Sequence, residues 1–162
     1  MREYTKPKDP RTPKQLAHRA KFGLVSSSLA PLKKFIKRGH IHDKNAYQQQ
    51  VSHAIKHAVA GEYPDLYIDY SKIRIASGNL SLPRVIRLYP EPMDGTATIT
   101  WHGSSVDSSL KSSGSDKLYV VCHDTDRPHE ARLFQPGVRE AEEATITLEP
   151  GWSVGATHFW VY

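Results

Sequence analysis

The spacing of apolar residues in this sequence changes once, close to Gly61, and the balance of charge changes shortly before it. Up to Gly61 apolar residues recur every three or four positions, as in helices, whereas after Leu66 they alternate with polar residues, as in strands. Residues 1–44 contain twelve Lys or Arg and three Asp or Glu, and residues 45–162 contain ten and fourteen. The sequence therefore predicts an α+β fold, in which a basic N-terminal segment of two to three α-helices precedes an antiparallel β-sandwich.

This pattern divides the chain into an extended basic arm at residues 1–11, a helical segment at residues 12–64 and a β-sandwich domain at residues 65–162. Two prolines, dense charge and few apolar side chains oppose regular structure in the arm. In the last part, short period-two runs separated by turn residues are typical of a sandwich or an open barrel. These runs predict strands at residues 66–70, 73–76, 84–89, 96–101, 118–122, 131–134, 144–148 and 158–162.

The helical segment carries clear start and stop signals. Thr12 is a suitable N-cap, because Pro13 fits the first helical position and Gln15 can complete a capping box. Pro31 interrupts the first helix, and a short second helix follows it. A third helix is predicted at residues 44–60. Its apolar stripe consists of Tyr47, Val51, Ala54, Ile55, Ala58 and Val59.

Residues 84–162 loosely resemble fibronectin type III and immunoglobulin-like sandwiches. The residues behind this resemblance are Ala97-Thr98-Ile99-Thr100-Trp101, Leu118-Tyr119-Val120-Val121 and Phe159-Trp160-Val161-Tyr162. A seven-stranded version would need one more strand than the sequence offers here. Three explanations stay open: the chain is truncated, an edge remains open for another chain, or the strand around Ile73 fills the gap.

Several groups of chemically versatile residues lack the partners that catalysis or metal binding requires. His53 and His57 are four apart on a helix, but they fall on its polar face and no Glu follows His53, so a solvated face is favoured over a metal site. A polar turn is favoured over a metal site at His40-Ile41-His42-Asp43. A turn is likewise favoured over a calcium site at Asp124-Thr125-Asp126. No serine lies in a nucleophile elbow, and no phosphate-binding glycine loop occurs. We predict that the protein is not an enzyme and that it binds no cofactor and no metal ion.

The single cysteine and the N-terminus bear on the compartment. Cys122 lies in an apolar run, which favours a packed structural thiol over a reactive one. The basic N-terminus is not followed by an apolar stretch, so we expect no signal peptide in this chain. No run of apolar residues approaches the length of a membrane span. These features predict a cytoplasmic protein with no membrane partner.

The basic residues of the N-terminal segment are the one feature that suggests a function. They could grip an acidic protein neighbour, another copy of the chain included, or neutralise the phosphates of a nucleic acid. A weaker alternative is a surface carbohydrate-binding sandwich that stacks sugars on Trp101, Trp152 and Trp160, although buried core aromatics are favoured there. The predicted interaction surface consists of Lys6, Lys8, Arg11, Lys14, Arg19, Lys21, Lys33, Lys34, Lys37 and Arg38.

Several runs of residues also resemble, in order and spacing, a family of uncharacterised proteins from Bacteroidota and their phages. The runs include Pro10-Arg11-Thr12-Pro13-Lys14-Gln15, Leu29-Ala30-Pro31-Leu32-Lys33, Ala58-Val59-Ala60-Gly61-Glu62-Tyr63-Pro64-Asp65 and Ile68-Asp69-Tyr70-Ser71-Lys72. The resemblance covers residues 6–82 and implies a helical head before a β-sandwich, with no established activity. Family members usually begin with a further Gly-rich segment and end with one more strand-like segment, so the resemblance leaves it open whether the sandwich here is complete at its last strand.

The resemblance also implies a virion or mobile-element setting. We therefore predict a non-enzymatic structural or interaction protein, a component or accessory protein of a phage or prophage-derived particle. In this prediction the basic arm and helices anchor the chain to protein partners in a larger assembly. The alternatives are a nucleic-acid-binding protein that contacts the phosphate backbone, and the carbohydrate-binding sandwich.

Overall fold

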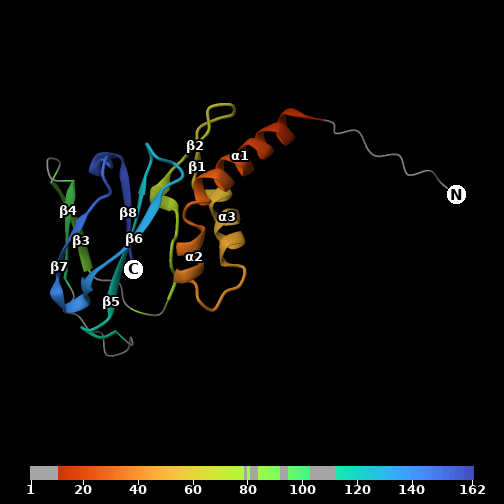
Figure 1. Ribbon diagram of the computed structural model, residues 1–162. Coiled ribbons are helices and arrows are strands. Elements are labelled where there is room, and N and C mark those ends of the chain that lie inside the picture. The colour runs from red at the N-terminus through yellow and green to blue at the C-terminus, as the bar shows by residue number, and fades with distance from the viewer. Residues whose placement is uncertain (1–10, 79, 81–83, 92–94, 103–111) are drawn as a thin grey trace.

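The computed structural model describes residues 11–78, 80, 84–91, 95–102 and 112–162. In these residues a layer of helices covers one of two facing antiparallel sheets (Figure 1). The sheet next to the helices has the strand order β6 (Ala131–Val138), β5 (Lys117–Asp124), β8 (Thr157–Val161). The outer sheet has the order β3 (Arg84–Glu91), β4 (Thr96–His102), β7 (Glu143–Thr147). The predicted α+β fold is confirmed, and the two sheets are consistent with a sandwich.

The helices follow the signals in the sequence. Helix α1 (Pro13–Leu29) starts with a complete capping box, in which the Gln15 N–H donates to the Thr12 hydroxyl and the Thr12 N–H donates to the Gln15 side chain. A turn at Pro31 leads into α2 (Lys33–Gly39), and α3 (Ala46–His57) follows. None of the described helices combines the length and the apolarity that crossing a membrane requires.

The third helix ends earlier than predicted. The prediction extended it to residue 60, whereas α3 stops at His57 and the short strand β1 (Val59–Ala60) pairs with β2 (Tyr67–Ile68). Gly61 turns the chain back at a φ of +80°, and the Asp69 N–H donates to the Ala58 carbonyl oxygen. A pairing with residues further along the chain therefore replaces the last helical turn. The predicted apolar stripe is confirmed, because all six of its residues pack in the helix–sheet core.

Two predicted strands between the helices and the sandwich also differ. Only Tyr67–Ile68 of the run at 66–70 forms a strand, and a 3-10 turn (Tyr70–Lys72) follows. Residues 73–76 belong to none of the three sheets of the described chain. Their period-two pattern arises because Ile73 and Ile75 are buried in the helix–sheet core while Arg74 is exposed. The alternation of buried and exposed side chains therefore gave the sequence pattern of a strand, although this segment pairs with no neighbouring strand in the described chain.

Strand β5 is the centre of the molecule, because both of its faces are covered. Val121 packs in the core shared with the helices, whereas Val120 and Cys122 pack in the core between the two sheets. Cys122 is fully buried, so the predicted packed thiol is confirmed. Burial raises the pKa of this thiol to about 12. The helices and the sandwich are thus joined through one strand that contributes to both cores.

Candidate anion-binding site

Helix α2 has one apolar face and one cationic face. Leu32, just before the helix, and Phe35 and Ile36 within it are buried under α1 and α3, at the spacing of successive helical turns. The side chains of Lys33, Lys34 and Lys37 are exposed on the other side. Burial of the apolar face therefore orients the three ammonium groups outward.

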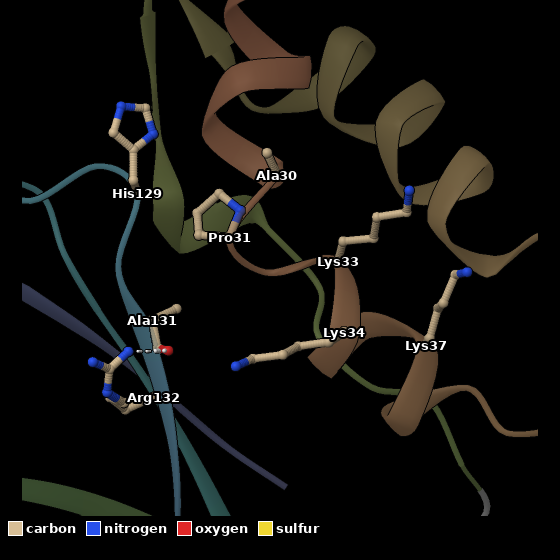
Figure 2. Close-up of a pocket in the computed structure, with 8 residues that line it drawn as sticks. All are labelled: Ala30, Pro31, Lys33, Lys34, Lys37, His129, Ala131 and Arg132. Atoms are coloured by element: carbon tan, nitrogen blue, oxygen red, sulfur yellow. Dashed lines mark hydrogen bonds between the residues drawn. The ribbon is translucent and has the colours of Figure 1, made fainter.

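A second set of residues faces this helix from the inner sheet. The hairpin loop between β5 and β6 and the first residues of β6 bring His129, Ala131 and Arg132 opposite α2. Together with the turn between α1 and α2, the two sets line an open pocket of about 500 Å³ (Figure 2). Its lining consists of Ala30, Pro31, Lys33, Lys34, Lys37, His129, Ala131 and Arg132.

The cationic side chains that line the pocket point in different directions. Lys34 extends toward β6, whereas Lys33 and Lys37 extend toward the side where α3 lies (Figure 2). The ammonium group of Lys33 lies 5.3 Å from the centre of the Tyr47 ring on α3, and that of Lys34 lies 4.7 Å from the Phe35 ring. Both ammonium groups thus lie over aromatic rings, which attract cations, while the lysine side chains stay exposed.

A carboxylate offsets the charge of Arg132 but not the charges of the three lysines. Arg132 donates from Nε to Oε1 of Glu149 at 2.9 Å, and from Nη1 to its neighbour Ala131's carbonyl oxygen at 3.4 Å. In the part of the chain that the structure describes, no carboxylate lies within ion-pair distance of Lys33, Lys34 or Lys37. Like charges at positions i and i+4 of a helix destabilise it by roughly 0.2–0.5 kcal/mol. A bound anion would relieve this repulsion between Lys33 and Lys37.

Buried polar residues fix the loop that carries His129. The Nδ1 of His123 donates to the carbonyl oxygen of Glu130 at 2.8 Å, and its Nε2 lies 3.2 Å from the Tyr70 hydroxyl. The carboxylate of Asp124, also buried, accepts from the Asp126 N–H at 2.9 Å and closes the turn. The sheet side of the pocket is therefore held by hydrogen bonds from the interior of β5, whereas its helix side depends on apolar packing.

Comparison with known proteins gives a family but no further relative. The sequence model of a family of unknown function, DUF6266, matches residues 1–161. The chain belongs to the DUF6266 family. Searches of curated proteins and of solved structures found no match. The family match covers both the helices and the sandwich, so both walls of the pocket lie within the DUF6266 region.

The structure brings together only part of the predicted basic surface of this DUF6266 chain. Lys33, Lys34 and Lys37 line the pocket, whereas Arg38 lies over the Tyr119 ring, 4.7 Å from its centre, beside a different groove. The four residues on or next to α1 do not line the pocket, and they are Arg11, Lys14, Arg19 and Lys21. Lys6 and Lys8 lie outside the described residues. Arg132 and His129 were not predicted, because no local pattern links them to α2.

The histidines and the aspartate that the sequence offered as possible metal ligands make local contacts in the structure. His40 donates from Nδ1 to the carbonyl oxygen of Ile36 at 2.9 Å, and Asp43 accepts from the Asn45 N–H at 2.8 Å. The rings of His53 and His57 lie next to each other, with centres 4.6 Å apart. Among the described residues, no three His, Cys, Asp or Glu side chains gather closely enough to hold a metal ion. The polar-turn interpretation of His40 and Asp43 is confirmed.

The three tryptophans of this DUF6266 protein serve mainly its interior. Trp101 is almost fully buried and donates from Nε1 to the Arg139 carbonyl oxygen at 2.7 Å. Trp152 is buried in the same core and donates to Oε2 of Glu130 at 3.2 Å. Trp160 is partly buried and donates to the Ile73 carbonyl oxygen at 3.1 Å. The prediction that Trp101 and Trp152 are core aromatics is confirmed.

Proposed function

We propose that this protein is a non-enzymatic interaction protein that attaches to an anionic partner through the pocket between α2 and β6. The observation that carries the proposal is that Lys33, Lys34 and Lys37 of α2 and Arg132 of β6 all line one pocket. Lysine ammonium groups are point-like donors on flexible stems that bind oxyanions, whereas Arg132 already pairs with Glu149 and adds to the set from the side of β6. Such a set suits a phosphate group.

The phosphate backbone of a nucleic acid is the partner that this geometry favours. Lys34 extends from α2 toward β6, and Lys33 and Lys37 lie on the same short helix, so the three ammonium groups can reach the oxygens of one compact oxyanion. Further exposed cations, Lys14 and Arg19, lie along α1 and could contact neighbouring phosphates without reading sequence. An acidic protein surface is the competing partner, and the experiment below separates the two.

The setting proposed for this interaction is a phage or prophage-derived particle. The resemblance to proteins of Bacteroidota and their phages supports this setting, and so does an architecture of a basic helical layer on a β-sandwich. In such a particle, in the cytoplasm or in the virion, the helical layer would attach the chain and the immunoglobulin-like or fibronectin-like sandwich would serve as its scaffold. Protein partners in the assembly, a second copy included, would then contact the remaining surfaces.

Binding measurements on charge-reversed variants test the proposal. The full chain is titrated into a fluorescently labelled DNA duplex, a labelled single strand and a labelled polyglutamate chain, at low salt, and anisotropy is followed. We expect DNA to bind and Lys34→Glu to weaken binding several-fold or more, because each phosphate contact adds a salt-dependent contribution. The matched control is Lys56→Glu, which changes the same charge at an exposed position of α3 away from the pocket.

The outcomes separate the two partners. Binding to DNA that is lost in Lys34→Glu and kept in Lys56→Glu supports the nucleic-acid proposal. Binding to polyglutamate alone, with the same dependence on Lys34, would replace nucleic acid with an acidic protein as the partner. Equal weakening by both variants would mean that net charge alone attracts the ligand, and the pocket would then have no special role.

A further inference from the structure

The outer edge of β8 carries backbone groups that point away from the sheet. Tyr119 and Tyr162 exchange both of their backbone hydrogen bonds, at 2.8 and 2.9 Å. The register of β5 and β8 then continues without a bulge, pairing Val121 with Trp160 and Cys122 with Phe159. Because hydrogen-bonded and non-hydrogen-bonded pairs alternate in an antiparallel ladder, the N–H and C=O groups of Phe159 and Val161 face outward. In the described part of the chain, no strand pairs with this edge.

A groove of about 800 Å³ runs beside this edge. Phe159, Trp160 and Val161 line one side of it, and the extended residues 73–78 line another. The hydrogen bond from Trp160 Nε1 to the Ile73 carbonyl oxygen fastens that segment to β8. Ile41 and Leu80, at 80% and 52% exposed, add apolar surface at the rim. The groove therefore offers open backbone groups and apolar contacts side by side.

The charge of the lining is mostly positive. Four basic residues and one acidic residue line the groove, namely Arg38, Arg74, Lys117, Arg139 and Asp116. Arg139 lies 3.6 Å from Asp116, so this pair is largely compensated. Arg38 and Arg74 are exposed, and Arg38 is held against the ring of Tyr119. An occupant that matches the groove must carry negative charge as well as apolar side chains.

We propose that the groove binds an extended segment of another protein, in which apolar and acidic residues alternate, as an added strand on β8. The backbone of the segment would pair with Phe159 and Val161, its apolar side chains would enter the groove, and its carboxylates would face Arg38 and Arg74. A second copy of this chain fits poorly, because β8 has no acidic residue and a β8–β8 pairing would bring two basic rims together. This site is separate from the α2–β6 pocket and does not depend on its function.

Amide hydrogen exchange followed by NMR tests the pairing directly. In the free protein, we expect the amides of Phe159 and Val161 to exchange faster than those of Trp160 and Tyr162, which bond to β5. The probe is a synthetic peptide of alternating Val and Glu, added at millimolar concentration. It should slow exchange selectively at Phe159 and Val161. Slow exchange of both amides in the free protein, or no change on adding the peptide, would overturn the proposal.

Two altered peptides and one variant test the chemistry of the occupant. A peptide of alternating Val and Lys should bind at least tenfold more weakly, and a Val-Glu peptide N-methylated on its pairing edge should not bind. Arg74→Glu, at an exposed position, should weaken the Val-Glu peptide and improve the Val-Lys peptide. Equal binding of the N-methylated peptide would show that no strand is added. Equal binding of the two charge types would show that the arginines do not select the partner.

Discussion

The Nδ1 atom of His123 lies 2.8 Å from the carbonyl oxygen of Glu130, so a buried imidazole in the central strand holds the loop at one side of the anion pocket. A carbonyl oxygen can only accept a hydrogen bond, which places the proton of the neutral ring on Nδ1. The other ring nitrogen, Nε2, can then accept from the Tyr70 hydroxyl at 3.2 Å. The hydrogen bonds on both sides of this ring therefore suit neutral His123.

We predict that the protein loses stability as the pH falls below about 6.5, the ordinary pKa of histidine. Burial lowers the pKa of His123, against opposing effects of its bond to Glu130 and of the Asp124 charge. Burial also lowers the pKa of His158, whose ring lies against Tyr70. The unfolded chain then binds more protons than the folded one in this range, so the free energy of unfolding must fall with pH.

Urea denaturation at a series of pH values between about 7.5 and 5 measures this effect, since such a series gives the free energy of unfolding at each pH. The pKa of Asp69 is lowered chiefly by its hydrogen bond from Ser71. Its protonation therefore lowers the free energy of unfolding only as the pH falls below its ordinary value of 3.8, outside the range of this series. His123→Gln should flatten the profile. A free energy of unfolding that stays constant or rises as the pH falls through this range would contradict the neutral, buried imidazoles.

The shared core predicts that the helices and the sandwich unfold together. Ile36 on α2 is fully buried in the core that also contains Val121 of β5. Ile36→Ala should lower the free energy of unfolding by about 2–5 kcal/mol, because it leaves a cavity between the layers. The matched control, Lys37→Ala on the exposed side of the same helix, should change it by less than about 0.5 kcal/mol.

Two probes follow this unfolding. Far-UV circular dichroism reports the helices. Tryptophan fluorescence reports the sandwich when it is measured in a Trp160→Phe background, because Trp101 and Trp152 lie between the sheets whereas Trp160 packs in the helix–sheet core. Both transitions should coincide and should shift together in Ile36→Ala. A fluorescence transition that stays unchanged while the helical signal shifts would show that the sandwich is stable without its helical layer.

Cys122 should be unreactive in the folded protein. With its pKa near 12, roughly one thiol in ten thousand is ionised at about pH 8, and the side chain is also fully buried. A disulfide reagent such as DTNB should therefore label it only as fast as the protein opens, whereas in concentrated urea the reaction should finish at once. Rapid labelling under native conditions would contradict the buried position of Cys122.

The sequence predicted the elements whose signals are local. The capping box at Thr12 and the turn at Pro31 marked the first helices, and six predicted strands appear in the two sheets of the described chain. The end of α3 was mispredicted, because Val59 continues the apolar stripe of a helix while its actual partner is Ile68. The run at Ile73 was mispredicted because one-sided burial and strand pairing leave the same alternation.

Only the helix side of the pocket could be predicted, because its residues are close together in the sequence and those of the sheet side are not. The spacing of the α2 lysines is local and can be read from the sequence, whereas Arg132 joins them in the pocket lining only through the packing of the inner sheet on the helices. The sequence indicated His123 only weakly, as a polar residue directly after the apolar run of β5. Its role depends on Glu130 and Tyr70, and no spacing along the chain shows those contacts.

The salt dependence of DNA binding tests the anion pocket most directly. The measurement is the slope of log K against log salt concentration for the wild-type chain and for Lys33→Gln/Lys34→Gln/Lys37→Gln. Each lysine that contacts a phosphate adds about one to this slope, so the triple variant should lose about three. A triple variant with the slope and affinity of the wild-type chain would contradict the proposed site.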